Sequence, residues 1–258
     1  MNILCVGDVF GEQGCQILQK CLPKIKKAKA IDMVIVNGEN SAVGNGITPA
    51  SARMLVNCGA DVVTGGNHTM RRKEIAETLE ECDYILRPAN LSADLPGGGY
   101  AVVDLGHTRV AVIRLLGSVY MECDENPFDA VDSLIQRAKD DGIKIVVVDF
   151  HAEVTSEKRA MGYYLDGKAS AVFGTHTHIA TADEQILPGG TGYITDIGMT
   201  GVDDSVLGVK KEIIVSRFKS GTQEKFLAAD GEGSLNGCIF SVDKNTGKCL
   251  SVERIKVK

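Results

Sequence analysis

The sequence predicts an α/β fold with a largely parallel central sheet, and three observations support this prediction. Short, almost continuously apolar segments at residues 3–6, 33–36 and 62–64 alternate with longer amphipathic segments. Continuous apolar runs are typical of strands that are buried on both faces. The alternation of such strands with helices is the pattern of parallel βαβ units. A chain of 258 residues that is 44% hydrophobic is also long enough to bury a sizeable core.

Helices are expected between these strands. The first runs from Glu12 to about Lys27, and Pro23 is expected to kink or stop it. The second begins near Thr48, which is suited to cap a helix whose first residue is Pro49. Further helices are expected over residues 71–82, 127–141 and 154–165, and further buried strands over residues 143–148 and 171–173.

The alternation of buried strands and helices does not continue regularly in the later part of the chain. Residues 99–105 and 109–115 alternate in character and predict a hairpin. Two late strands are expected over residues 238–242 and 250–255, joined by a turn. Because no Ser-rich or Pro-rich linker and no internal repeat interrupts the sequence, we expect a single domain over residues 1–258.

The composition excludes several classes of function. The formal net charge of −6 argues against an extended nucleic-acid surface or an anionic membrane as the partner, since both require a basic surface. No apolar run approaches the ~20 residues of a membrane helix. The eight cysteines are scattered without a CxxC pair, and the start lacks a basic secretory signal. These features predict a cytoplasmic protein.

Polar side chains follow each of the five buried strands. In a parallel sheet these positions meet at the carboxyl edge, where α/β proteins bind ligands. Only His107 among the five histidines lies elsewhere. In an extended segment, residues two apart point to one face, so a His-x-His pair can reach one centre. The candidates are Asp8, Glu39, Asn40, Asn67, His68, His151, His176 and His178.

Each candidate has an ordinary structural explanation when it is taken singly. Asp8 can cap the next helix, and an Asn-His pair is common in turns. The convergence of all of them on five strand ends favours a site instead. Carboxylate, amide and imidazole ligands without thiolate suit iron, manganese or zinc. Two such ions about 3.5–4 Å apart generate hydroxide at neutral pH and clamp a phosphoryl group during in-line attack.

This set of residues resembles the five-block signature of calcineurin-like metallophosphoesterases. It most resembles the bacterial YmdB-like branch, whose members act on cyclic nucleotides. The resemblance implies a four-layer sandwich of two packed mixed β-sheets with helices outside. The blocks are GDVFG at residues 7–11, GEN at 38–40, GNH at 66–68, the lone His151, and GTHTH at 174–178.

The resemblance also implies a role for each residue. Phe10 stands where the general superfamily has a histidine ligand, so Asn40 is expected to supply that ligand. His68 is expected to donate a proton to the leaving group or to hold the phosphate. Thr175, inserted before the His-x-His pair, is expected to have no consequence. The implied ligands are Asp8, Glu39, Asn40 and His178 for one metal, and Glu39, Asn67, His151 and His176 for the other.

The leading hypothesis is therefore a phosphodiesterase that uses two divalent ions, iron or manganese before zinc, to hydrolyse 2′,3′- or 3′,5′-cyclic nucleotides. A metal-bridging hydroxide would attack phosphorus, with His68 as general acid. A phosphomonoesterase or a nuclease on the same site is the alternative. The family also suggests a homo-oligomer. No substrate-binding residue can be assigned, because the few aromatic candidates for base stacking (Tyr100, Phe150 and Tyr193) fit a core equally well.

Two other classes of protein remain as hypotheses. The first is a non-hydrolytic nucleotide-binding module, since Gly7, Gly11 and Gly14 lie between a strand and a helix. Their spacing differs from G-x-G-x-x-G, and Asp8 would point negative charge at a pyrophosphate. The second is a regulatory protein that retains the metal site for signalling or assembly.

Overall fold

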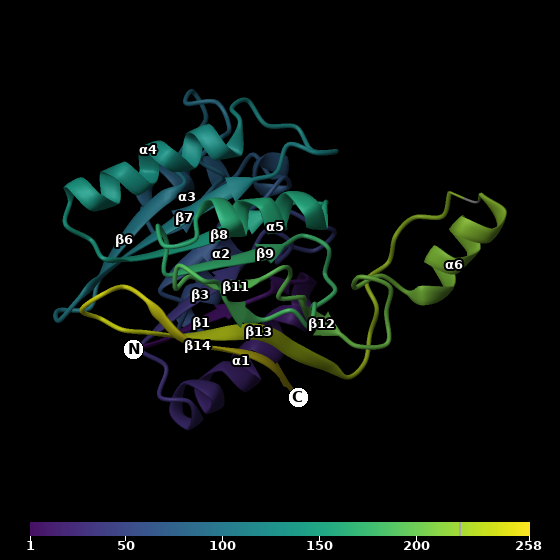
Figure 1. The fold of residues 1–258 in the computed structure, drawn as a ribbon. Coiled ribbons are helices and arrows are strands. Elements are labelled where there is room, and N and C mark those ends of the chain that lie inside the picture. Colours follow the sequence, from purple (N-terminus) through teal and green to yellow (C-terminus); the bar gives the residue numbers. More distant parts are fainter. Residues whose placement is uncertain (222) are drawn as a thin grey trace.

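Two mixed β-sheets pack face to face, and helices cover their outer faces (Figure 1). The structure is a computed structural model, and it describes residues 1–221 and 223–258. The two sheets replace the single, largely parallel sheet that the apolar pattern predicted. They confirm the four-layer sandwich that the resemblance implied.

The first sheet contains the N-terminal strand at its centre. Its order is β2-β12-β13-β1-β3-β4-β5, with β14 also paired to β13. Strand β1 is parallel to β3 and antiparallel to β13, so segments from the two ends of the chain are neighbours. The strands are β1 (Asn2–Val6), β2 (Asp8–Val9), β3 (Met33–Asn37), β4 (Val62–Thr64), β5 (Ile85–Leu86), β12 (Met199–Val202), β13 (Gly233–Val242) and β14 (Cys249–Val257).

The second sheet has the order β10-β11-β9-β8-β7-β6. The inner strands β7, β8, β9 and β11 are parallel, and the edge strands β6 and β10 are antiparallel to their neighbours. The hairpin predicted around His107 is the β6–β7 pair. The strands are β6 (Tyr100–Asp104), β7 (Arg109–Leu116), β8 (Ile145–His151), β9 (Ala171–Thr175), β10 (Gln185–Ile186) and β11 (Gly192–Ile194).

The helices begin largely where their capping signals predict. Thr48 caps α2 by accepting a 3.1 Å hydrogen bond from the backbone N–H of Ser51, and Pro49 is the first helical residue. The helices are α1 (Gly11–Ala28), α2 (Pro49–Asn57), α3 (Ile75–Glu81), α4 (Pro127–Asp140), α5 (Thr155–Tyr164) and α6 (Lys211–Ser220), with a short 3₁₀ helix, η1 (Thr69–Arg71).

Three local expectations need correction. Helix α1 continues through Pro23 instead of stopping there, because the face that carries Leu18, Leu22 and Ile25 is buried and holds the helix on the sheet. The single helix expected over residues 71–82 is divided into η1 and α3. Helix α6 was not expected, and it projects from the sandwich on an arm (Figure 1).

Three buried clusters fill the spaces between the four layers. In β1, Leu4 and Val6 pack with residues of α1 and α2, whereas Ile3 and Cys5 face the second sheet. A third cluster lies between the second sheet and α4 and α5. This arrangement explains why the central strands read as continuously apolar: each strand is covered on both faces.

Two further observations concern the chemistry of the chain as a whole. Five of the eight cysteines are buried and all eight are free, so the buried ones act as small apolar residues. Within the part of the chain that the structure describes, none of the helices has the length and apolar character needed to span a membrane.

Candidate metal centre

The candidate residues meet at the seam between the two sheets, where the strands of both have their carboxyl ends. Asp8, Glu39 and Asn67 follow or begin strands of the first sheet, whereas His151 ends β8 and His176 directly follows β9 of the second. The convergence predicted from the sequence is therefore present. A group that binds here contacts both sheets.

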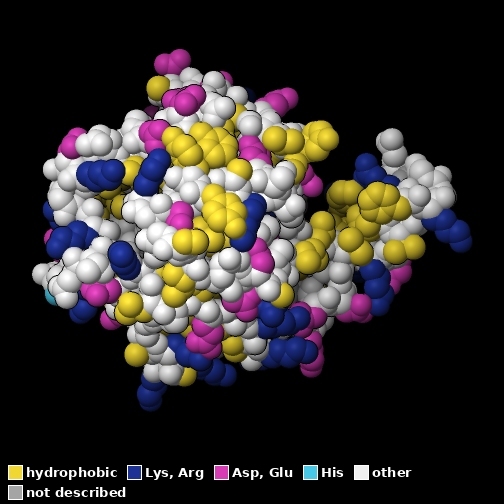
Figure 2. All heavy atoms as spheres, viewed as in Figure 1, with side chains coloured by type: hydrophobic (Ala, Val, Ile, Leu, Met, Phe, Trp, Pro, Cys, Tyr) yellow, Lys and Arg dark blue, Asp and Glu magenta, His cyan; other side chains and the backbone are white. Residues whose placement is uncertain are grey.

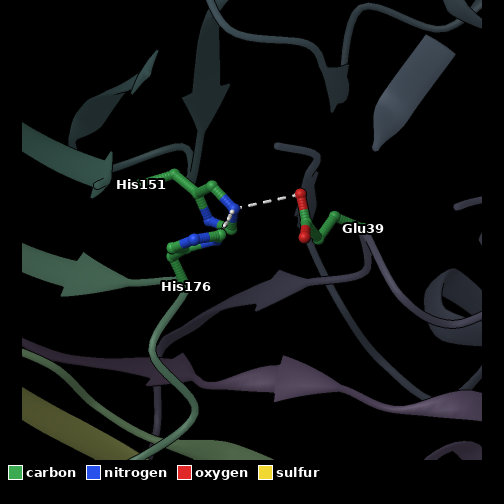
Figure 3. A group of neighbouring side chains, drawn as sticks. All are labelled: Glu39, His151 and His176. Carbon is green, nitrogen blue, oxygen red and sulfur yellow. Dashed lines mark hydrogen bonds and ion pairs between the residues drawn. The ribbon is translucent and has the colours of Figure 1, made fainter. Parts of the chain in front are cut away.

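One half of the centre surrounds the inner nitrogen of His151. Its Nε2 lies 3.1 Å from Glu39 Oε2, 3.0 Å from Asn67 Oδ1 and 3.0 Å from His176 Nδ1. Figure 3 shows Glu39, His151 and His176 pointing toward one another, and their ligand atoms lie within 4.8 Å of each other.

The other half of the centre lies around Asp8 and His178. Nε2 of His178 is 3.6 Å from Asp8 Oδ1 and 3.5 Å from Asn40 Nδ2. Asn40 also donates a 2.9 Å hydrogen bond from Nδ2 to Glu39 Oε1, so Glu39 joins the two halves. The ring of Phe10 packs edge-on against the ring of His178.

His68 lies beside the centre and is partly exposed. Its Nδ1 is 3.1 Å from Asn40 Oδ1 and 3.2 Å from Glu39 Oε1. Two acceptor oxygens therefore hold one ring nitrogen. The other nitrogen, Nε2, is left as the one that can face a substrate.

In His176 and His178, the ring nitrogen that faces away from the centre contacts an oxygen atom. The sequence analysis did not identify the residues that supply these two oxygens. Nε2 of His176 is 2.9 Å from Glu153 Oε2, and Nδ1 of His178 is 3.2 Å from the backbone carbonyl oxygen of Leu207. A proton on each outer nitrogen leaves the inner nitrogen with a free lone pair. Glu153 lies two residues after His151 and could have been suspected, but no sequence signal identifies a carbonyl 29 residues beyond His178.

Burial and charge together set the protonation of the centre. Burial lowers the pKa of His151 to about 4. Burial likewise opposes the charged forms of Asp8 and His178, yet their contact lowers the pKa of Asp8 and raises that of His178. His151 is thus neutral at pH 7, as a metal ligand must be.

These residues fit a metal ion. Three atoms with lone pairs, from Glu39, Asn67 and His176, lie within hydrogen-bond distance of His151 Nε2. Several acceptor atoms that face one another with few donor hydrogens between them form a suitable environment for a cation. In addition, Asp8 Oδ1 is fully buried and has no hydrogen-bond partner among the described residues. The donor set of imidazole, carboxylate and amide oxygen matches iron, manganese or zinc.

A cavity of about 460 Å³ borders the centre at His178. Its walls include Met199, Asn236 and the charged side chains of Arg254 and Lys256. The volume falls in the range of small-molecule sites. Of the three aromatic residues considered for base stacking, Phe150 and Tyr193 do not line this cavity.

Those two residues, Phe150 and Tyr193, are core residues with 1% of their surface exposed. They pack in the cluster between the second sheet and its helices. Tyr100 lies at the edge of the same cluster and is partly buried, with Arg137 over its ring. The substrate-binding residues therefore stay unassigned.

Known proteins are similar to this chain in both sequence and fold. A family model described as "YmdB-like protein" matches residues 4–255. The chain is 42% identical to the 2′,3′-cyclic-nucleotide 2′-phosphodiesterase of Bacillus subtilis (strain 168), over 100% of this chain and 97% of the relative. The crystal structure of a hypothetical protein from Thermus thermophilus matches with a TM-score of 0.92 and 37% identity, over 99% of this chain and 98% of that one.

The crystal structure of a novel phosphatase from Mycoplasma pneumoniae also matches with a TM-score of 0.92, at 34% identity, over 100% of this chain and 93% of that one. These matches extend along almost the full length of the chain. The chain has a metallophosphoesterase-like fold and belongs to the YmdB-like protein family.

Proposed function

We propose that this chain is a phosphoric ester hydrolase, and specifically a phosphodiesterase that hydrolyses cyclic nucleotides with two divalent metal ions. The observation that carries the proposal is the position of Glu39. One of its carboxylate oxygens contacts Asn40 in one half of the centre, and the other contacts His151 in the other half. A carboxylate in this position can bridge two ions. The name of the Bacillus subtilis relative favours 2′,3′-cyclic nucleotides as substrates.

The proposed ligands are those that the family resemblance implied. Bound ions would supply activation of water as the nucleophile and neutralisation of charge on the phosphate. Iron and manganese are the proposed metals, and the donor set also allows zinc. Asp8, Glu39, Asn40 and His178 would hold one ion, and Glu39, Asn67, His151 and His176 the other.

The chain itself contributes the proton that the reaction needs. Hydrolysis of a cyclic diester breaks one phosphorus–oxygen bond, and the oxygen that leaves must gain a proton. His68 is suited to this step, because Glu39 and Asn40 hold its Nδ1, so Nε2 is the ring nitrogen that remains to protonate the leaving oxygen. We assign His68 as the general acid.

A phosphomonoesterase is the second candidate, since the Mycoplasma pneumoniae relative is described as a phosphatase. Substrate rates separate the two activities. Protein purified without oxygen and loaded with Mn²⁺ or Fe²⁺ should hydrolyse 2′,3′- or 3′,5′-cyclic nucleotides faster than the corresponding monophosphates. Faster turnover of any monoester would contradict the phosphodiesterase assignment. Protein that binds a nicotinamide cofactor and no transition metal would overturn the whole proposal.

Three substitutions test the assigned roles. His68→Ala should retain both metals and lose at least about 100-fold in turnover, as expected for loss of a general acid. Asp8→Ala should lose metal instead. His107→Ala, in the β6–β7 turn far from the centre in the sequence, is the matched control and should change neither quantity. Full activity of the His68 variant would remove its assigned role.

We also propose that the chain acts as one domain, forms a homo-oligomer and functions in the cytoplasm. The arm that carries α6 supports the oligomer, because apolar side chains gather on it in contact with water (Figures 1 and 2). Phe218 is 87% exposed, and Val215, Phe226 and Leu227 are each about half exposed or more. A ten-residue helix of this kind is marginal alone and gains stability when its apolar side chains are covered.

Light scattering tests the oligomer directly. The wild-type protein should have a mass of at least twice the 27.5 kDa of one chain. Phe218→Ser should lower the measured mass, whereas Leu250→Ser, at an exposed apolar residue of β14, should not. A monomeric wild-type protein would contradict this part of the proposal.

A further inference from the structure

A buried hydroxyl group lies directly behind the metal centre. Thr175 ends strand β9, and its side chain is fully buried. Its Oγ1 is 2.9 Å from His151 Nδ1, 2.9 Å from Asp149 Oδ1 and 3.1 Å from Arg114 Nη1. Asp149 and Arg114 form an ion pair with no exposed surface. The residue that the sequence treated as a harmless insertion therefore contacts a proposed ligand.

The number of hydrogens in this network determines the direction of each bond. Arg114 can only donate, and the hydroxyl of Thr175 carries a single hydrogen. Asp149 faces donors from Arg114, Thr175 and Thr64, whose Oγ1 is 2.6 Å from Asp149 Oδ2. Although burial raises the pKa of Asp149, three donors around its carboxyl group match the ionised form. The hydrogen of Thr175 is then committed to Asp149.

It follows that Thr175 must accept the bond from His151. Its two lone pairs face Arg114 Nη1 and His151 Nδ1, so the histidine nitrogen has to donate. A proton on Nδ1 leaves the lone pair of Nε2 directed at Glu39, Asn67 and His176. The orientation of the ring and the position of its proton are both set before an ion arrives.

We propose that Thr175, oriented by Asp149 and Arg114, is a positioning residue that keeps His151 in the Nδ1–H form in which Nε2 can bind metal. This inference rests on the proposed role of His151 as a metal ligand. It differs from ordinary core packing because it requires an acceptor at one point, and a methyl group of the same size cannot replace it.

Substitution of Thr175 by valine removes the acceptor and preserves the shape. In Thr175→Val the Nδ1–H would be buried without a partner, which costs about 1–3 kcal/mol. Moving the proton to Nε2 relieves that cost, because Glu39 Oε2 and Asn67 Oδ1 lie there as acceptors. The lone pair needed for metal is then lost.

The test measures the tautomer and the metal affinity rather than activity alone. Long-range ¹H–¹⁵N NMR spectra of the metal-free wild-type protein should show His151 protonated at Nδ1. Thr175→Val should show it protonated at Nε2 and should bind Mn²⁺ about 10–100-fold more weakly in titration calorimetry. Thr175→Ser restores the hydroxyl and should bind within about threefold of wild type.

Thr64→Val is the matched control. It removes another buried hydroxyl that donates to Asp149, but Thr64 does not accept from His151. It should lower stability and leave the His151 tautomer unchanged. A wild-type tautomer with the proton on Nε2, or equal Mn²⁺ affinity in the wild-type and Thr175→Val proteins, would overturn the inference. If Thr175→Val does not fold, the wild-type spectrum still decides. A wild-type protein that binds no metal would instead refute the proposed function.

Discussion

The absence of a side chain at Gly66 makes room for the residue that joins the two halves of the centre. A Cβ built at this position would lie 1.7 Å from Glu39 Oε2 and 2.6 Å from His151 Nε2. Its backbone does not adopt the left-handed conformation, so alanine would fit the main chain and clash only with the centre. The glycine in the GNH block is therefore explained by the close approach of Glu39 and His151 and not by a turn.

We expect Gly66→Ala to weaken Mn²⁺ binding by roughly 100-fold or more, because Glu39 must move away from His151. The circular dichroism spectrum should stay close to that of the wild-type protein. Gly98→Ala is a suitable control, since nothing lies within 4 Å of a Cβ at Gly98. Unchanged Mn²⁺ affinity in the Gly66 variant would show that Glu39 is not a ligand in the arrangement described above.

His151 should make the metal-free protein sensitive to acid. Its pKa is about 4 in the folded state and ordinarily 6.5, so the unfolded chain binds the proton more readily. Stability should therefore fall as the pH decreases from about 6.5 toward 4. The difference corresponds to roughly 3 kcal/mol at most. The raised pKa of His178 acts in the opposite direction, because its charged form stabilises the fold at low pH.

Urea unfolding of chelator-treated protein at several pH values measures this effect. The slope between pH 6.5 and 4.5 should be smaller in His151→Gln than in the wild-type protein, while the contribution of His178 remains in both. Identical slopes would mean that His151 titrates normally in the folded state.

The candidate residues that the sequence predicted lie at the ends of buried strands, whereas the residue that it missed is placed by the pairing of two neighbouring strands. Asp8, Glu39 and His151 were found because they follow buried strands, and parallel strands bring their carboxyl ends to one edge. The contact of Thr175 with His151 was missed because it depends on the register of β9 against β8, which places the two residues opposite each other. Such a contact between neighbouring strands cannot be read from either strand alone.

At the level of elements, the strands and helices of the sandwich were predicted where burial gives a clear pattern. Helix α6 was missed because only Ile213 and Ile214 in it are buried, so it has no continuous apolar stripe. The base of its arm nevertheless contributes to the centre. The carbonyl oxygen of Leu207 faces His178, and Gly208 lies against the ring of Phe10, which itself contacts His178.

We therefore expect the arm base to influence one half of the centre more than the other. In Gly208→Ala the new Cβ would lie 2.4 Å from the Phe10 ring, at a φ of +91° that disfavours alanine. Mn²⁺ binding at the Asp8–His178 side should weaken about tenfold, by analogy with other losses of support behind a ligand. Electron paramagnetic resonance of Mn²⁺-titrated protein can follow the occupancy of each site.

Gly221→Ala separates this effect from general strain on the arm. Gly221 also has a positive φ, +70°, but nothing lies within 4 Å of a Cβ there. It should reduce the stability of the arm without altering Mn²⁺ binding. If both variants bind Mn²⁺ equally, the base of the arm does not support His178.

For the molecule as a whole, the position of the candidate centre at the seam of the sheets would couple metal binding to the stability of the fold. The first sheet supplies Asp8, Glu39 and Asn67, and the second supplies His151 and His176. Without metal, the sheets are joined here by hydrogen bonds such as the 2.6 Å bond from Thr64 to Asp149. Bound ions would add ligand bonds to both sheets that the unfolded chain cannot form.

Metal removal should therefore lower the melting temperature of the entire protein in one transition. At a free Mn²⁺ concentration 100 times the dissociation constant of a site, each occupied site adds about 2.7 kcal/mol, which for a chain of this size corresponds to about 5–10 °C per site. Scanning calorimetry with Mn²⁺ and with chelator measures the shift. Glu39→Gln weakens a ligand that both ions would share and should reduce the shift strongly, whereas His107→Ala should keep it. A melting temperature that does not change with Mn²⁺ would mean that Mn²⁺ does not bind the folded protein in preference to the unfolded chain.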